Sequence, residues 1–100
     1  MTETNEWKSR SIQQMAEKVK FLRTHEGMGV GDLGIELRLH KQRIAFLETG
    51  EYRVDLRDLI RYCDYFGLDY EGFLFDDFKT FQAAYLADAE KMLKAIGYSV

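Results

Sequence analysis

Three closely spaced helix starts constrain the fold more than any other feature of this sequence. In each, a polar residue that can cap a helix lies between two apolar residues placed as a hydrophobic staple, which fixes where the helix begins. The pairs are Leu39 with Ile44, Val54 with Leu59, and Leu68 with Phe73, around the predicted caps His40, Asp55 and Asp69. Because these starts follow one another so closely, the middle of the chain must fold into short helices.

Apolar residues at helical spacing predict the remaining elements, and no segment alternates with the period of a strand. A first helix is expected over residues 11–25 and a second over 30–38, while Gly50 is placed to end a third helix over 41–49. The last segment, 77–96, carries Phe78, Phe81 and Tyr85 on one stripe. The sequence thus predicts an all-α fold, with a flexible lead-in over residues 1–10, a domain over 11–76 and a C-terminal helix within 77–100.

Composition excludes several classes of protein. With 100 residues and a hydrophobic fraction of 46%, the chain can bury one core. No apolar run approaches the roughly 20 residues of a membrane span, and the first residues lack a signal-peptide pattern. The lone Cys63 fits a reducing compartment, so a cytoplasmic location is expected.

No metal, cofactor or catalytic activity is expected. His25 and His40 have no neighbouring ligand at metal-binding spacing. No nucleophile–base pair and no phosphate-binding loop is visible, so the chain is not predicted to be an enzyme.

The distribution of charge is uneven. The net charge is −3, which argues against indiscriminate binding to nucleic acid. Residues 1–60 carry ten basic and ten acidic residues, whereas residues 61–100 carry four and seven. A modestly basic surface is therefore expected in the middle of the chain and an acidic one in the last third.

The second and third predicted helices are joined by only residues 38–40, the length that a helix-turn-helix requires. Leu33, Leu37, Ile44 and Leu47 are spaced to hold both helices against a core. The positions left facing outward on the third helix supply the amide, cationic and apolar groups that read base edges in the DNA major groove. These predicted base-contacting residues are Lys41, Gln42, Arg43 and Phe46, and for Arg43 a contact to a phosphate is an equal alternative.

The segment Leu33 through Gly50, LGIELRLHKQRIAFLETG, resembles the helix-turn-helix of the phage-repressor and Cro-like proteins, the XRE family. The similarity extends without gaps from about Ile12 to Leu74. It implies a five-helix, lambda-repressor-like DNA-binding domain, to which this chain adds a C-terminal helix. It further implies a structural ion pair between Arg23 and Glu48, and a contact from Arg53 to the DNA backbone.

The chain departs from the family pattern around the second helix. Gly29 and Val30 stand where the family usually has a capping Ser or Thr followed by Gln, which grips a phosphate. The backbone N–H groups of Gly29, Val30 and Gly31 are predicted to approach a phosphate instead, and His40 is expected to lie near another. Gly34 replaces the usual alanine, at an expected cost of about 1 kcal/mol.

Further departures affect the turns and the recognition helix. Arg38 replaces the turn glycine, and Val54 replaces the proline before the fourth helix. Phe46 has two interpretations: it presses on a thymine methyl group, or it is buried against a neighbouring element.

The C-terminal aromatic stripe also has two interpretations. It completes the core of its own chain, or it pairs with a second copy. The second is favoured, since five helices already close a core, and it makes Phe78, Phe81 and Tyr85 the predicted dimerisation residues. A homodimer would bind a palindromic operator with two half-sites.

The favoured function is a sequence-specific regulator of transcription, in the form of a repressor, that binds double-stranded DNA. One alternative is the antitoxin of a toxin–antitoxin pair, in which a second surface masks a toxin or another regulatory protein. The other is a helix-turn-helix protein-interaction module without DNA binding. The negative net charge, the missing phosphate grip and Phe46 favour this last alternative.

Overall fold

The computed structural model describes residues 2–50 and 55–95, and the side chains of 12–50 and 55–91. The described residues form six helices and no strand, so the predicted all-α class is confirmed. The helices are α1 (Thr2–His25), α2 (Val30–Leu37), α3 (Lys41–Thr49), α4 (Leu56–Phe66), α5 (Tyr70–Phe75) and α6 (Phe78–Ala95).

The three predicted caps begin the three predicted helices. His40 Nδ1 accepts a hydrogen bond from the backbone N–H of Gln42 at 3.1 Å. The Asp55 carboxylate accepts from the N–H of Arg57 at 2.9 Å, and the Asp69 carboxylate accepts from the N–H of Gly72 at 2.9 Å. Each side chain satisfies a backbone donor that has no partner within its helix.

Helix α1 begins at Thr2, whereas the sequence predicted a flexible lead-in over residues 1–10 and a helix from Ser11. The prediction followed the apolar stripe, which starts at Ile12. A helix can continue past its apolar stripe where no helix-breaking residue intervenes, and residues 2–10 contain neither glycine nor proline.

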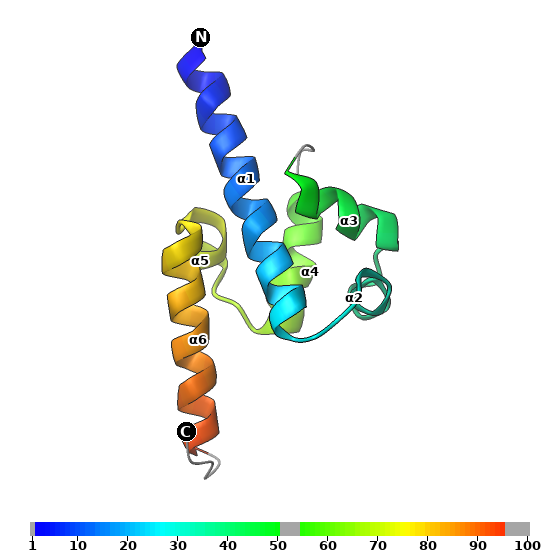
Figure 1. The fold of residues 1–100 in the computed structure, drawn as a ribbon, viewed down its shortest axis with the longest axis vertical. Coiled ribbons are helices and arrows are strands. Elements are labelled where there is room, and N and C mark those ends of the chain that lie inside the picture. The colour runs from blue at the N-terminus through cyan, green and yellow to red at the C-terminus, as the bar shows by residue number, and fades with distance from the viewer. Residues whose placement is uncertain (1, 51–54, 96–100) are drawn as a thin grey trace.

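Helices α2 and α3 lie on one side of α1 and α4, and α5 and α6 lie on the other (Figure 1). The core between them is apolar and includes at least one residue from every helix. Its buried members are Met15, Val19, Leu22, Leu33, Leu37, Ile44, Leu47, Leu59, Tyr62, Cys63, Phe73 and Phe81. No helix in the described part of the chain combines the length and the apolar character that crossing a membrane requires.

The aromatic stripe of α6 packs inside the chain. The ring of Phe21 on α1 lies 5.9 Å from Phe78, 6.4 Å from Phe81 and 5.7 Å from Tyr85, centroid to centroid, each in edge-to-face geometry. Phe81 also contacts Phe73 of α5 and is only 6% exposed. The structure therefore supports the interpretation within the chain: Phe81 lies in the core, and Phe78 and Tyr85 are partly buried against Phe21.

Lys18 on α1 is buried between α5 and α6. Its Nζ donates to the backbone carbonyl of Phe73 at 2.8 Å and lies 5.8 Å from the centre of the Phe81 ring. Burial lowers the pKa of this amine, while the charges of Asp76 and Asp77 act in the opposite direction. A cation at the C-terminal end of a helix is favourable, so Lys18 ties α1 to the end of α5.

Candidate nucleic-acid interface

Helix α3 exposes one face and buries the other. Ile44 and Leu47 are buried against the core, at 0% and 5% exposure. The side chains that remain exposed come from the first turn and from positions one and two turns later. They are Lys41, Gln42, Arg43, Ala45, Phe46 and Thr49.

An ion pair joins the end of α3 to α1. Arg23 donates from Nε and Nη2 to the two carboxylate oxygens of Glu48, at 2.7 and 2.9 Å. Its Nη1 donates to the carbonyl of Met28 at 2.8 Å, and the bond to Glu48 raises the pKa of Arg23. Such two-point geometry fixes orientation as well as distance. The pair that the family resemblance implied therefore has the geometry to hold α3 at a set angle to α1.

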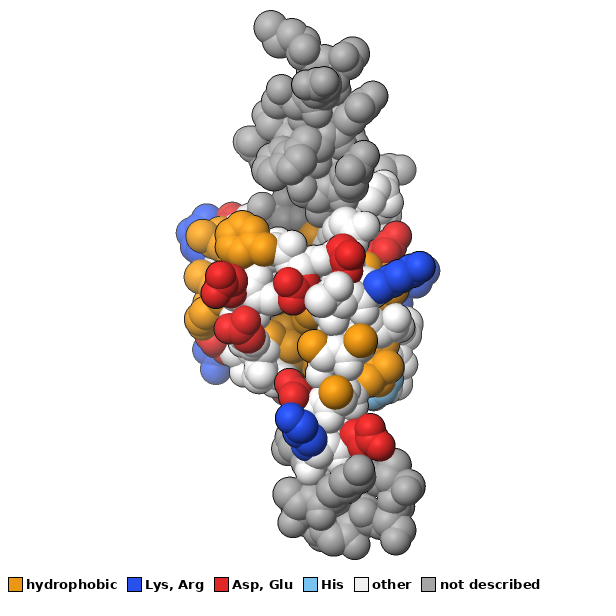
Figure 2. Space-filling view, turned by 90° about the vertical axis from the view of Figure 1, so that its left-hand side faces the viewer, with side chains coloured by type: hydrophobic (Ala, Val, Ile, Leu, Met, Phe, Trp, Pro, Cys, Tyr) orange, Lys and Arg blue, Asp and Glu red, His pale blue; other side chains and the backbone are white. Residues whose placement is uncertain are grey.

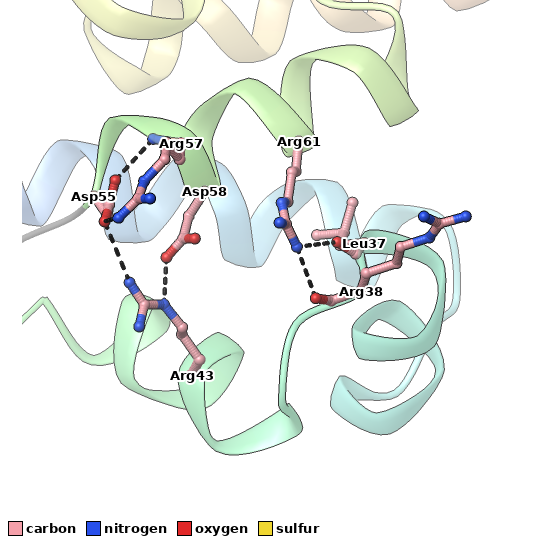
Figure 3. A network of polar contacts seen from close by, with 7 residues as sticks. All are labelled: Leu37, Arg38, Arg43, Asp55, Arg57, Asp58 and Arg61. Carbon is pink, nitrogen blue, oxygen red and sulfur yellow. Dashed lines mark hydrogen bonds and ion pairs between the residues drawn. The ribbon is translucent and has the colours of Figure 1, made fainter.

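Arg43 points from α3 toward α4 (Figure 3). Its Nε donates to the buried carboxylate of Asp58, and its Nη2 lies 3.7 Å from Asp55. The bond to Asp58 raises the pKa of Arg43, while the pKa of Asp55 is lowered chiefly by the N–H of Arg57. A base contact, as the sequence predicted, would require Arg43 to leave a buried carboxylate without its cation. Arg43 is therefore better described as a residue that seats α3 on α4.

The turn between α2 and α3 is tight and closed by hydrogen bonds. Arg38 adopts the left-handed conformation, with φ 58° and ψ 42°, where the family has glycine. Arg61 of α4 donates to the carbonyls of Leu37 and Arg38, at 3.1 and 2.7 Å (Figure 3). These bonds satisfy carbonyls that the end of α2 leaves open, so the turn keeps its shape although it lacks glycine.

Gly34 has a steric role that the sequence analysis missed. A Cβ atom at this position would lie 2.6 Å from the carbonyl oxygen of Leu39, a backbone atom of the turn. Glycine therefore permits the close approach of the turn to α2. At this position alanine, and not glycine, is expected to lower the stability of the fold.

The start of α2 is acidic. The carboxylate of Asp32 accepts a hydrogen bond from the backbone N–H of Gly29 at 3.2 Å. A carboxylate there stabilises the helix and repels a second anion. The predicted phosphate contact at Gly29, Val30 and Gly31 therefore has an unfavourable electrostatic setting, because a side chain from the same helix already supplies the anion.

The other predicted contact residues are placed as follows. Lys41 and Gln42 are exposed on the first turn of α3. Phe46 is 48% exposed, so the structure does not bury it. Since Nδ1 of His40 accepts the capping bond, Nε2 of the neutral ring carries the proton and is the atom able to donate outward. Arg53 lies outside the described residues.

Some residues of this surface were missed from the sequence. Ile35, on the outer face of α2, is 78% exposed, which the spacing of Leu33 and Leu37 alone could have indicated. Asp58 gave no such signal, since its partner Arg43 lies on another helix.

The described residues offer neither a metal site nor a reactive thiol. In the part of the chain that the structure describes, no three His, Cys, Asp or Glu side chains gather to hold a metal ion. Burial raises the pKa of Cys63 to about 11, which keeps this core thiol protonated and unreactive.

Neither a family model, nor a curated protein, nor a solved structure matches the chain.

Proposed function

We propose that the protein is a sequence-specific regulator of transcription that reads the DNA major groove with α3. In this proposal the first five helices form a lambda-repressor-like domain of the XRE family, α6 completes its core, and the protein acts in the cytoplasm as a repressor. One observation carries the proposal: the first turn of α3 presents Lys41 and Gln42 to solvent, while the opposite face of that helix is buried.

The exposed groups match the chemistry of base edges. The amide of Gln42 can form two bonds with adenine, and the ammonium of Lys41 can donate to the acceptors of guanine. Phe46 lies one turn further along the helix and supplies an apolar surface for a thymine methyl group. His40, at the positive end of α3, is placed to donate from Nε2 to a phosphate.

The supports around α3 favour this use of the helix. Arg23 holds its C-terminal end, Arg43 its first turn, and the closed turn the residues that lead into it. A recognition helix held at three points loses little conformational freedom on binding, which favours specificity. A dimer on a palindromic operator remains part of this proposal, with a contact surface other than the α6 stripe.

Selection from random DNA duplexes at physiological salt tests the proposal. The chain is expected to enrich one consensus sequence, and the double variant Lys41→Ala/Gln42→Ala is expected to lose about tenfold to a hundredfold of its preference for it. A matched control is Lys79→Ala/Gln82→Ala, which removes the same side chains from α6 and should leave the consensus unchanged.

A second candidate, a protein-interaction module without DNA binding, is favoured by a specific observation. Two large apolar side chains, Ile35 and Phe46, are exposed on the helix-turn-helix, and Asp32 places a negative charge at the start of α2. This candidate replaces the first if no duplex binds about tenfold more tightly than non-specific competitor DNA.

A further inference from the structure

A groove lies on the side of the molecule away from α3. It has a volume of about 320 Å3 and runs between α6 and the segment that joins α4 to α5. Its floor is apolar and aromatic and includes the core residues Phe73 and Phe81. A second hollow, lined by Met28 and Tyr65, continues from it, since Glu26, Phe66 and Tyr85 line both.

The rim of the groove is acidic. Four carboxylates line it, those of Glu26, Asp69, Asp76 and Asp88, and no lysine or arginine is among its lining residues. Glu26 accepts a hydrogen bond from the Tyr85 hydroxyl and lies 3.7 Å from His25, and Asp69 caps α5. Among the described side chains, no arginine or lysine lies at ion-pair distance from any of the four, and the buried Lys18 acts on Asp76 only over a longer distance. The same flank of the molecule carries carboxylates among apolar side chains, with cations mainly toward its edges (Figure 2).

We propose that this groove docks a segment of another protein that presents apolar side chains flanked by lysines or arginines. The apolar floor provides the surface to be buried, and the acidic rim provides the charge that such a segment complements. Nucleic acid does not fit, because its phosphates would face the four carboxylates. A twofold contact with a second copy does not fit either, because each acidic rim would then meet its own equivalent.

Helix α6, which lines one side of the groove, lies on the opposite side of α1 from α3 (Figure 1). A partner in the groove therefore leaves α3 accessible. The docking proposal is independent of DNA binding, and either one stands if the other fails.

Alanines on α6 allow a matched test. Ala84 lines the groove, while Ala83 is exposed and is not among its lining residues. Ala84→Arg therefore places a bulky cation in the groove, whereas Ala83→Arg adds the same side chain and charge to another face of the same helix. Both variants should keep the helical circular dichroism and the unfolding midpoint of the parent chain.

The probe is a random peptide library displayed on phage and selected on the full chain. Recovered peptides are expected to combine apolar residues with a net positive charge, to bind Ala84→Arg about tenfold or more weakly, and to bind Ala83→Arg as they bind the parent. Amide chemical shifts of the groove residues should move when one such peptide is added.

Two outcomes would overturn the docking proposal. One is a selection that recovers no peptides, or only neutral or acidic ones. The same holds if the recovered peptides bind Ala84→Arg with the affinity that they have for the parent. The other is a parent chain that is dimeric by light scattering and becomes monomeric in Ala84→Arg, which would assign the groove to a second copy.

Discussion

Helices α3 and α6 use aromatic side chains in opposite ways. Phe46 of α3 is 48% exposed, whereas Phe81 of α6 is 6% exposed. Helix α3 has nine residues, and Ile44 and Leu47 already fill its contact with the core. Helix α6 has 18 residues and lies along α1, where Phe21 meets three of its rings. An aromatic residue on an amphipathic helix is thus buried or exposed according to what the neighbouring helix presents to it.

The largest difference between the two helices is expected in the free energy of unfolding when each aromatic side chain is truncated. Phe81→Ala is expected to lower the free energy of unfolding by about 3–5 kcal/mol, since it leaves a cavity in the core. Phe46→Ala should lower it by less, about 1 kcal/mol, because only about half of this side chain is withdrawn from solvent. Urea denaturation followed by circular dichroism measures both, and equal losses would remove the distinction between the helices.

The close packing of the turn before α3 against α2 can be tested at Gly34. Gly34→Ala is expected to lower the free energy of unfolding by about 1–3 kcal/mol, because the new methyl group meets the Leu39 carbonyl. Gly31→Ala is the matched control in the same helix, since an added Cβ there has no neighbour within 4 Å, and it should be neutral or stabilising. A stabilised Gly34→Ala would show that the turn does not approach α2 this closely.

The exposed position of Phe46 predicts its part in reading DNA. Replacing thymine by uracil at the contacted position of the selected consensus removes only the methyl group. It should weaken binding of the parent chain by about 1 kcal/mol and leave the affinity of Phe46→Ala unchanged. Gel-shift titrations of the four combinations give this coupling, and additive losses would mean that Phe46 does not contact the methyl group.

A smaller difference is expected between two cations on α3, Lys41 and Arg43, in their effects on the salt dependence of DNA binding and on stability. Lys41→Gln is expected to reduce the slope of log affinity against log salt by at most about one, because it removes one cation from the proposed DNA-reading face. Arg43→Gln should leave that slope nearly unchanged and lower the thermal unfolding midpoint, because Arg43 faces Asp58 and Asp55. The reverse pattern would mean that Arg43 turns outward on DNA.

Local signals predicted the middle of the chain well. Caps and staples are formed by residues close in sequence, so the bounds of α3, α4 and α5 could be inferred from His40, Asp55 and Asp69. The exposed first turn of α3 was predictable for the same reason, since the spacing of Ile44 and Leu47 determines which positions face outward.

Contacts between distant residues could not be predicted in the same way. The stripe on α6 has the same spacing whether it meets Phe21 of its own chain or a second copy. The Arg43–Asp58 pair and the approach of Leu39 to Gly34 depend on helix packing, which no local pattern records. The burial of Lys18 could be predicted only in part. Its position one helical turn from both Met15 and Leu22 places it within the apolar stripe.

The two hydrogen bonds from Arg61 to the carbonyls of Leu37 and Arg38 have a consequence for local unfolding of the protein. They attach the turn before α3 to the middle of α4, so opening of the turn while α4 stays in place breaks both bonds. Amide hydrogens of the turn, such as that of Leu39 bonded to the Gly34 carbonyl, should therefore exchange with solvent in the same opening event as those of α4. Helices α3 and α4 would then form one cooperative unit of local unfolding.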